Sequence, residues 1–386
     1  MSTFSIIIPA YNEEEAIAEI LTRCLDARKR LCEENGLTAV EIIAVDDGSR
    51  DKTREIALTF KDAKLVVHPK NRGYGAALMT GFGAAAGDYL GFLDADGTCD
   101  PLAFTSLFKA LKEGGADMAV GNRLHGKSEM PLIREIGNRF YAGVISWLSG
   151  VHVDDTASGM RVFKKELLPR LSPLPTGLHF TPAMTARAAC MGAKIVEAPI
   201  PYAERQGQSK LNVIVDGLRF LRVILGTIFA YFPMRIFGPM GLSFLIVSFC
   251  YGLGPVAYYA EHRHLLDSEM IYRLLTIMTL AVCGFIALTF GVIAQKISDI
   301  AIARPPAWYD ATWLGEGAVG SGVLLGLAGV ILNTRTILEY ATTRTIQTPW
   351  VYVLTGGLCV IVGTVLAAFG VTFWLVEHLP RAEKKP

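Results

Sequence analysis

Apolar runs and amphipathic stretches alternate along the first hundred residues of the chain. Short apolar runs at 4–9, 39–45, 65–67 and 89–97 predict strands, and the alanine-rich stretch 76–86 predicts one of the helices between them. Asn12 is expected to cap the first helix. Strands that alternate with helices indicate an α/β fold with a mainly parallel sheet, whose ligand crevice follows the carboxyl ends of the strands.

The apolar residues of the C-terminal half form longer runs. Segments 236–258, 273–295, 317–333 and 350–376 are nearly free of charge, so we expect four helices that span a membrane. The third is short and glycine-rich, which leaves open two or three spans with this segment at the interface. A hydrophobic content of 51% agrees with a membrane protein.

Three segments follow from these patterns: a globular domain at 1–210, an interfacial helix at 211–234, and a transmembrane domain at 235–380. In the middle segment Arg219 and Arg222 can face lipid headgroups while apolar neighbours such as Phe220, Leu221, Val223 and Ile224 enter the acyl boundary. The alternative is a core helix of the globular domain.

The start of the chain runs directly into a strand, so we expect no signal peptide and a globular domain that stays in the cytosol. Positive charges in the predicted loops support this orientation only modestly. A net charge of +1 gives no reason to expect nucleic acid, and seven cysteines without a Cys-x-x-Cys pair favour reduced thiols.

Two carboxylates, Asp94 and Asp96, close the run at 89–97 with a spacing that places both on one side of an extended backbone. Such a pair can hold Mg²⁺ or Mn²⁺ when a diphosphate supplies the remaining oxygen ligands. The plain alternative is a pair of turn acids before Gly97. Other polar clusters also follow strands, which favours the interpretation of Asp94 and Asp96 as metal ligands.

Two further clusters follow neighbouring strands. Asp46 and Asp47 can accept hydrogen bonds from a base or ribose, and Arg72 with the amides of Gly73 and Gly75 can face phosphate. Simple turn chemistry is the alternative for the two acids. The glycines lack the third member of the dinucleotide fingerprint, which excludes a nicotinamide or flavin site.

Seven motifs in order resemble the family-2 glycosyltransferases of the GT-A fold. They are PAYNEEEAI (9–17), VDDGSRDKT (45–53), NRGYGAA (71–77), LDADGT (93–98), GNR (121–123), DTASGMRVF (155–163) and ERQGQSKL (204–211). More narrowly, the chain resembles membrane enzymes that move a hexose from a nucleotide sugar to a polyisoprenyl phosphate, such as dolichyl-phosphate mannose synthases and their undecaprenyl-phosphate relatives. The resemblance covers about 4–230.

This resemblance implies roles for individual residues. The nucleotide would contact Pro9, Ala10, Tyr11, Glu13, Asp46, Asp47, Arg72, Gly73, Asp94 and Ala95. The acceptor phosphate would contact Arg123, Arg134, Arg205, Ser209 and Lys210. Asp94 and Asp96 would hold the metal, and Asp96 and Asp155 would be catalytic. Asp155 either acts as a base or orients the arginines, its neighbour Asp154 leaves the assignment open, and Arg161 is interpreted as structural.

The chemistry of the acceptor suggests the mechanism. A phosphate with a second pKa of about 6 is already ionised at neutral pH, so it can attack the anomeric carbon without a strong base. Such an enzyme mainly positions its substrates and neutralises charge, with inversion at the sugar. The expected partners are a nucleotide sugar, either UDP-glucose or GDP-mannose, a polyisoprenyl phosphate and the membrane; a homo-oligomer is left open.

One segment departs from the family. Where related chains often carry acids in the stretch 177–184, this chain has His179 and Ala183, which leaves the sugar specificity open. His179 as a metal ligand is disfavoured against a packed side chain.

Two other functions were weighed. A processive polysaccharide synthase should carry Gln-x-x-Arg-Trp, which begins at none of Gln206, Gln208, Gln295 and Gln347. A non-catalytic scaffold would not need Asp94, Asp96, Arg123 and Lys210 together.

Overall fold

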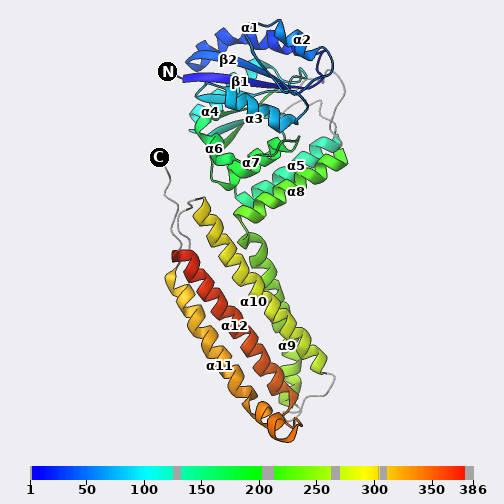
Figure 1. The fold of residues 1–386 in the computed structure, drawn as a ribbon, viewed down its shortest axis with the longest axis vertical. Helices are drawn as coiled ribbons and strands as arrows, with labels where there is room; N and C mark the ends of the chain where they lie inside the picture. The colour runs from blue at the N-terminus through cyan, green and yellow to red at the C-terminus, as the bar shows by residue number, and fades with distance from the viewer. Residues whose placement is uncertain are drawn as a thin grey trace. The chain divides into compact units, whose positions relative to one another are not determined.

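The computed structural model describes residues 2–124, 132–201, 213–261, 270–302, 304 and 311–378. The chain divides into two compact units, Met1–Ile228 and Phe229–Pro386, which are described separately (Figure 1). The first unit contains a sheet with helices, and the second is helical.

A seven-stranded sheet forms the centre of the first unit, in the order β3-β2-β1-β4-β6-β5-β7. Its strands are β1 Ser2–Ala10, β2 Leu37–Asp46, β3 Lys64–Val67, β4 Tyr89–Phe92, β5 Met118–Asn122, β6 Arg161–Lys164 and β7 Ile195–Pro199. All neighbours pair in parallel except β6, which is antiparallel to β4 and β5. The predicted α/β fold with a mainly parallel sheet is confirmed, and the carboxyl ends of six strands share one edge with the start of β6.

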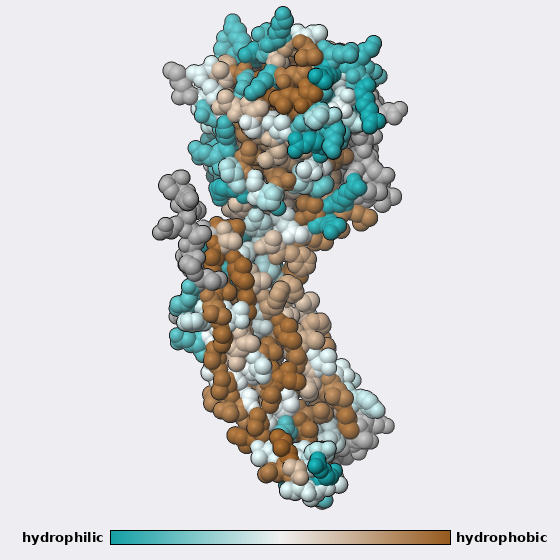
Figure 2. All heavy atoms as spheres, viewed as in Figure 1, coloured by the Kyte–Doolittle hydropathy of each residue, from teal (hydrophilic) through white to brown (hydrophobic). Residues whose placement is uncertain are grey.

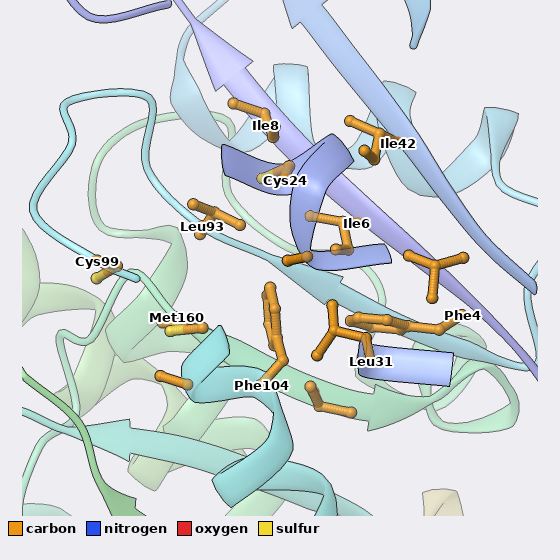
Figure 3. Packing of buried hydrophobic residues seen from close by; sticks show 14 of the residues in the cluster. Phe4, Ile6, Ile8, Cys24, Leu31, Ile42, Leu93, Cys99, Phe104 and Met160 are labelled. Atoms are coloured by element: carbon orange, nitrogen blue, oxygen red, sulfur yellow. The ribbon is translucent and has the colours of Figure 1, made fainter. Parts of the chain in front are cut away.

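Helices cover both faces of this sheet. The helices of the chain up to Tyr231 are α1 Ile17–Asn35, α2 Thr53–Leu58, α3 Tyr74–Ala84, α4 Phe104–Glu113, α5 Leu132–Ser149, α6 Leu168–Leu171, α7 Phe180–Cys190 and α8 Val213–Tyr231, with 3₁₀ turns η1 Pro101–Ala103 and η2 Lys165–Leu167. Of these, α1 and α4 pack on one face of the sheet, and α3 and α7 on the other. Alternate residues of β1 feed two cores: Phe4 and Ile6 pack with α1 and α4 (Figure 3), and Ile7 packs with α3 and α7. A strand buried on both faces explains the continuous apolar run from which it was predicted.

Two local predictions are wrong. The strand expected at 89–97 ends at Phe92, so Asp94 and Asp96 lie in the loop that follows, with Asp96 in a turn. Asn12 does not cap the first helix, because α1 begins at Ile17. Asn12 instead has a positive φ of 50°, and its Oδ1 accepts a hydrogen bond of 2.8 Å from the Arg50 amide.

Four long helices make up the second unit: α9 Met234–Glu261, α10 Met270–Ala301, α11 Thr312–Thr343 and α12 Trp350–His378. Each is long and apolar enough to cross a membrane, and Figure 2 shows hydrophobic residues over much of their visible surface. The third predicted span, which looked short, belongs to a helix of 32 residues. The expectation of about four spans is therefore met by length and composition.

Glycines face glycines where α11 packs on α12. Gly315 lies opposite Gly370, Gly322 opposite Gly363, and Gly329 opposite Gly356. A Cβ at any of the six would lie within 3.4 Å of the partner's carbonyl oxygen, so the backbones touch directly. Both rows repeat every seven residues, which keeps them on one face of each helix.

Polar contacts fix the same unit at two further points. Lys296 of α10 is only 4% exposed, and its Nζ lies 3.6 Å from Glu377 Oε2 and 3.4 Å from the centre of the Phe373 ring, both on α12. Near the end of α11, Glu339 Oε2 accepts hydrogen bonds from the turn before α12: from the Gln347 amide at 3.0 Å and from the Thr348 amide and hydroxyl, both at 2.8 Å.

Candidate active site

Asp94 and Asp96, the two predicted metal ligands, lie in the loop after β4. Asp94 Oδ1 accepts a hydrogen bond of 2.8 Å from the Tyr74 hydroxyl at the start of α3. Asp96 Oδ1 accepts hydrogen bonds from the Thr98 amide at 3.2 Å and the Thr98 hydroxyl at 2.7 Å, and Gly97 makes the turn with a φ of 75°. Each acid is therefore held by a neighbouring hydroxyl, which fixes the direction of its carboxylate.

A second segment closes over Asp94 from the loop before β6. A Cβ at Gly159 would overlap Asp94 Oδ2, so only glycine lets this loop come so near. Burial, followed by the charge of Asp94, raises the pKa of Tyr74, which keeps its hydroxyl a hydrogen-bond donor.

These acids fit a divalent cation that is shared with a substrate. Within the described ranges, no group of three or more His, Cys, Asp and Glu side chains could hold a metal by itself. Burial raises the pKa of the nearby Cys99 thiol to about 12, so this thiol stays neutral and is a poor ligand. Mg²⁺ commonly binds through one or two carboxylates plus phosphate oxygens, and two carboxylates are what this loop offers.

Asp47 holds a loop in place. Its Oδ1 contacts His68 Nδ1 at 2.6 Å and accepts the Arg72 amide at 2.9 Å, while its Oδ2 accepts the Gly73 amide at 2.8 Å. His68 Nε2 in turn lies 2.9 Å from the Thr80 hydroxyl. Asp47 and the Gly73 amide bond to each other here, and contact of Asp47 with a base or ribose and of the Gly73 amide with phosphate stays a prediction.

Asp46 differs from its neighbour. It is 2% exposed, and its Oδ1 accepts a hydrogen bond of 2.9 Å from the Ser49 amide. The Asp47 amide bonds to the Ala10 carbonyl at 2.8 Å, which joins the loops after β1 and β2.

The other residues expected at the nucleotide lie along the same edge. Pro9 is buried in β1, Tyr11 and Glu13 are half-buried in the loop after it, Arg72 is exposed, and Ala95 is buried between the two acids. The Glu13 amide donates to the Thr53 hydroxyl at 2.8 Å, which ties this loop to the start of α2.

Arg123, just after β5, forms a planar ion pair with Asp155. Its Nε and Nη2 each lie 2.8 Å from one carboxylate oxygen, and its amide donates to Oδ2 at 3.0 Å. Asn138 of α5 donates to Asp155 Oδ1 at 2.7 Å. Although burial acts to raise it, the pKa of the Asp155 carboxyl is lowered by the Arg123 guanidinium. The two neighbouring acids have different partners: the side chain of Asp154 meets the exposed His152 at 3.3 Å, whereas that of Asp155 pairs with Arg123.

Glu197 and Asn122 support this pair and were missed from the sequence. Glu197 Oε1 accepts the amides of Asp154 at 3.0 Å and Asp155 at 2.9 Å, and Oε2 accepts Asn122 Nδ2 at 2.8 Å. Burial raises the pKa of Glu197. The GNR motif was a signal for Asn122, but a single glutamate in a short strand carries no signal.

The surroundings of Arg161 agree with the structural role expected for it. It is fully buried at the start of β6, and it donates to the carbonyls of Ser158 at 3.2 Å and Thr156 at 2.7 Å. Burial lowers its pKa to about 10, which still leaves it charged at neutral pH.

Four of the residues predicted to contact the acceptor phosphate have side chains outside the described part of the chain. Arg205, Ser209 and Lys210 lie outside the described residues, as does the side chain of Arg134, whose backbone belongs to α5. In the segment that departs from the family, Ala183 is fully buried in α7 and His179 precedes that helix.

Exposed apolar side chains lie on α5 and α8, which contact each other. The Tyr141 hydroxyl donates to the Gly217 carbonyl at 2.7 Å, and the Tyr141 and Phe220 rings pack 6.1 Å apart. We define the α5/α8 surface by its exposed apolar side chains, which are Ile136, Phe140, Trp147, Leu218 and Leu225.

This exposure pattern changes one expectation. Phe220 and Ile224, predicted to enter the acyl boundary, are buried in the protein, whereas Leu218 and Leu225 are exposed.

Comparison with known proteins identifies the family. Residues 5–172 match the family described as glycosyl transferase family 2. The chain is 34% identical over 227 residues to the low-salt glycan biosynthesis hexosyltransferase Agl6 of Haloferax volcanii, a match that covers 58% of this chain and about half, 53%, of that relative. It is 34% identical over 218 residues to a dolichyl-phosphate hexose transferase of the same organism, covering 55% of this chain and 88% of the relative.

A solved structure of glucosyl-3-phosphoglycerate synthase from Mycobacterium tuberculosis with UDP resembles 59% of this chain, and the match covers 80% of that chain. The TM-score is 0.46 at 22% identity. The identity to the curated relatives, together with the matched family, leads to one conclusion: this chain belongs to glycosyl transferase family 2 and is a glycosyltransferase.

Proposed function

We propose that this enzyme transfers a hexose from a nucleotide sugar to a polyisoprenyl phosphate, with inversion and with a divalent metal, at the cytosolic face of a membrane. The observation that carries the proposal is the meeting of two acids and an arginine at one sheet edge. Gly159 of the loop before β6 lies against Asp94, and Asp155 of the same loop pairs with Arg123. This arrangement supports a cation site for a leaving diphosphate near a guanidinium suited to a second phosphate.

Asp46 is the residue that we assign to the nucleotide base. Its buried carboxylate can accept a hydrogen bond from the ring N–H of uracil or guanine. Asp47 takes a different role, since it holds the 72–73 backbone and thereby places the exposed Arg72 beside the site. A divalent cation at Asp94 and Asp96, when bound, offsets the negative charge of the leaving diphosphate.

Asp155 is assigned a positioning role instead of that of a base. Its carboxylate is buried, ion-paired and has a lowered pKa, so it is a weak proton acceptor at neutral pH. An ionised phosphate needs no base to attack the sugar. Asp155 therefore orients Arg123, and Arg123 neutralises the incoming phosphate.

The apolar surface supports a lipid acceptor. Phe140 and Trp147 are large apolar side chains that are more than half exposed, and an amphipathic pair of helices of this kind can lie in a lipid interface. The relative named as a dolichyl-phosphate hexose transferase points the same way.

The test is transfer of radiolabelled hexose from UDP-glucose or GDP-mannose into an organic-extractable polyisoprenyl phosphate by the full-length enzyme. Label that needs Mn²⁺ or Mg²⁺, disappears with EDTA and is lost in Asp96→Ala would support the proposal and identify the donor. Tight nucleotide binding without lipid label from either donor would refute the lipid acceptor. Insoluble polymeric label would favour a polysaccharide synthase.

A further inference from the structure

Glu197 is a half-buried carboxylate that binds backbone close to the site. It lies in β7 opposite Val120 of β5, at the end of the sheet where the site is built. In the part of the chain that the structure describes, its three hydrogen bonds come from neutral donors: the amides of Asp154 and Asp155, and the side chain of Asn122. Burial of a carboxylate costs free energy that these three hydrogen bonds offset, so the carboxylate and its donors hold one another in place.

The backbone that Glu197 holds is the one that carries Asp155. The Asp155 amide is fixed by Glu197, while the Asp155 carboxylate receives both nitrogens of the Arg123 fork. Asn122, the other partner of Glu197, directly precedes Arg123 and accepts the Leu124 amide at 2.8 Å. Glu197 thus contacts the chain on both sides of the Arg123–Asp155 pair and makes its hydrogen bonds to neither of the two charged groups.

We propose that Glu197 is a positioning residue, which locks the Asp154–Asp155 backbone and Asn122 so that Arg123 is presented to the acceptor phosphate. This proposal rests on the function proposed above. Movement of the backbone by a fraction of an ångström would tilt the planar guanidinium away from phosphate, since bidentate geometry depends on direction.

The hydrogen-bond pattern suggests a substitution that disturbs only the contact between Glu197 and Asn122. In Glu197→Gln the amide oxygen can still accept the two backbone amides, but its NH₂ group then meets the NH₂ group of Asn122. Asn122 cannot turn over without losing the Leu124 amide, which its Oδ1 accepts. Two donors therefore face each other in the single variant.

A second change restores the pattern. In the double variant Asn122→Asp with Glu197→Gln, one oxygen of the new carboxylate accepts the Leu124 amide, and the other accepts the NH₂ group of the new glutamine. The net charge is the same as in the wild type. A matched control is Asp117→Asn at the opposite end of the same strands, where Asp117 accepts the Lys194 amide at 3.1 Å and pairs with Lys164 at 3.0 Å.

The experiment measures KM for polyisoprenyl phosphate and for the nucleotide sugar in the full-length protein. We expect Glu197→Gln to raise KM for the lipid roughly tenfold and KM for the donor by less than about twofold. The double variant should recover most of the loss, and Asp117→Asn should change neither KM. Equal rises in both KM values, an unchanged lipid KM, or a double variant no better than the single one would each overturn the proposal.

A second readout separates this proposal from the proposed function. Amide hydrogen exchange at Asp155 and Leu124 should accelerate roughly fivefold or more in Glu197→Gln, return in the double variant, and stay unchanged in Asp117→Asn. If the wild type labels no lipid phosphate, the proposed function fails while exchange still decides whether Glu197 orders this backbone. Unchanged exchange in Glu197→Gln would refute the positioning role whatever the acceptor.

Discussion

At the scale of single residues, the closeness of Gly159 to Asp94 gives the first prediction. Gly159→Ala places a Cβ that overlaps Asp94 Oδ2, so the Asp94 carboxylate or the loop that carries residue 159 must shift. We expect the affinity for Mn²⁺ with UDP or GDP to fall by about tenfold or more, measured by calorimetry.

The matched control is Gly83→Ala in α3, because a Cβ there meets nothing within 4 Å. Metal affinity that is the same in both variants would show that Asp94 does not hold the cation.

Asp155 gives a prediction about pH. Its pKa in the folded protein lies below the usual value of 3.8, so its ion pair adds stability that is complete above about pH 4 and is lost as the pH falls through the folded pKa. Asp155→Asn leaves the largely buried Arg123 without this partner and should cost about 3–5 kcal/mol at pH 7.

Thermal unfolding of the detergent-solubilised protein across pH 3–8 tests this. The gap between wild type and Asp155→Asn should be constant from pH 6 to 8 and narrow below pH 4. A gap that widens with acid would contradict the assigned direction of the shift.

Several site residues could be predicted and others could not. Asp94, Asp96 and Arg123 stand in motifs whose order is informative, and the loop before β6 contacts Asp94 through Gly159 and Arg123 through Asp155. The choice between Asp154 and Asp155 needed the fold, because neighbouring residues differ only in which way they point. Asn138 and Glu197 act through contacts 17 and 42 residues away along the chain, which no local pattern records.

At the scale of elements, α5 and α8 carry a prediction about the membrane. The double variant Phe140→Ser with Trp147→Ser removes two of the largest exposed apolar side chains of the α5/α8 surface. We expect transfer to lipid acceptor in liposomes to fall severalfold while nucleotide affinity stays the same, because only the lipid-facing contact is weakened.

Leu58→Ser in α2, a residue that is 59% exposed, serves as the control. If both proteins transfer at the wild-type rate, the α5/α8 surface does not meet lipid.

The elements themselves were predictable where burial was simple. β1 and β2 are buried on both faces, so their apolar runs indicated their existence and nearly their bounds. The antiparallel direction of β6 was not predictable, because nothing in the sequence of a four-residue strand indicates whether it runs parallel or antiparallel to its neighbours. The loop at Asp94 was mistaken for strand because Leu93 and Ala95 are buried on either side of it, which imitates alternation.

At the scale of the whole second unit, the facing glycines of α11 and α12 predict that no larger side chain is tolerated at these positions. Gly363→Leu should force α11 and α12 apart, since a Cβ there already meets the Gly322 carbonyl and the Gly326 backbone. We expect a destabilisation of about 1–3 kcal/mol or more, seen as a lower melting temperature in detergent. Gly320→Leu, whose Cβ would meet nothing within 4 Å, should leave the melting temperature unchanged, and an equal drop in both variants would contradict the packing.

The seven-residue repeat of these glycines has a consequence for how the two helices find each other. If α12 slid along α11 by one repeat, about 10 Å, two of the three glycine pairs would form again with new partners. Glycine packing alone is therefore degenerate and tolerates more than one alignment. Glu339 removes this ambiguity, because it accepts three hydrogen bonds from Gln347 and Thr348 only when the turn has its present length and position. The carboxylate of Glu339 thus selects one of the alignments that the repeated glycines would allow.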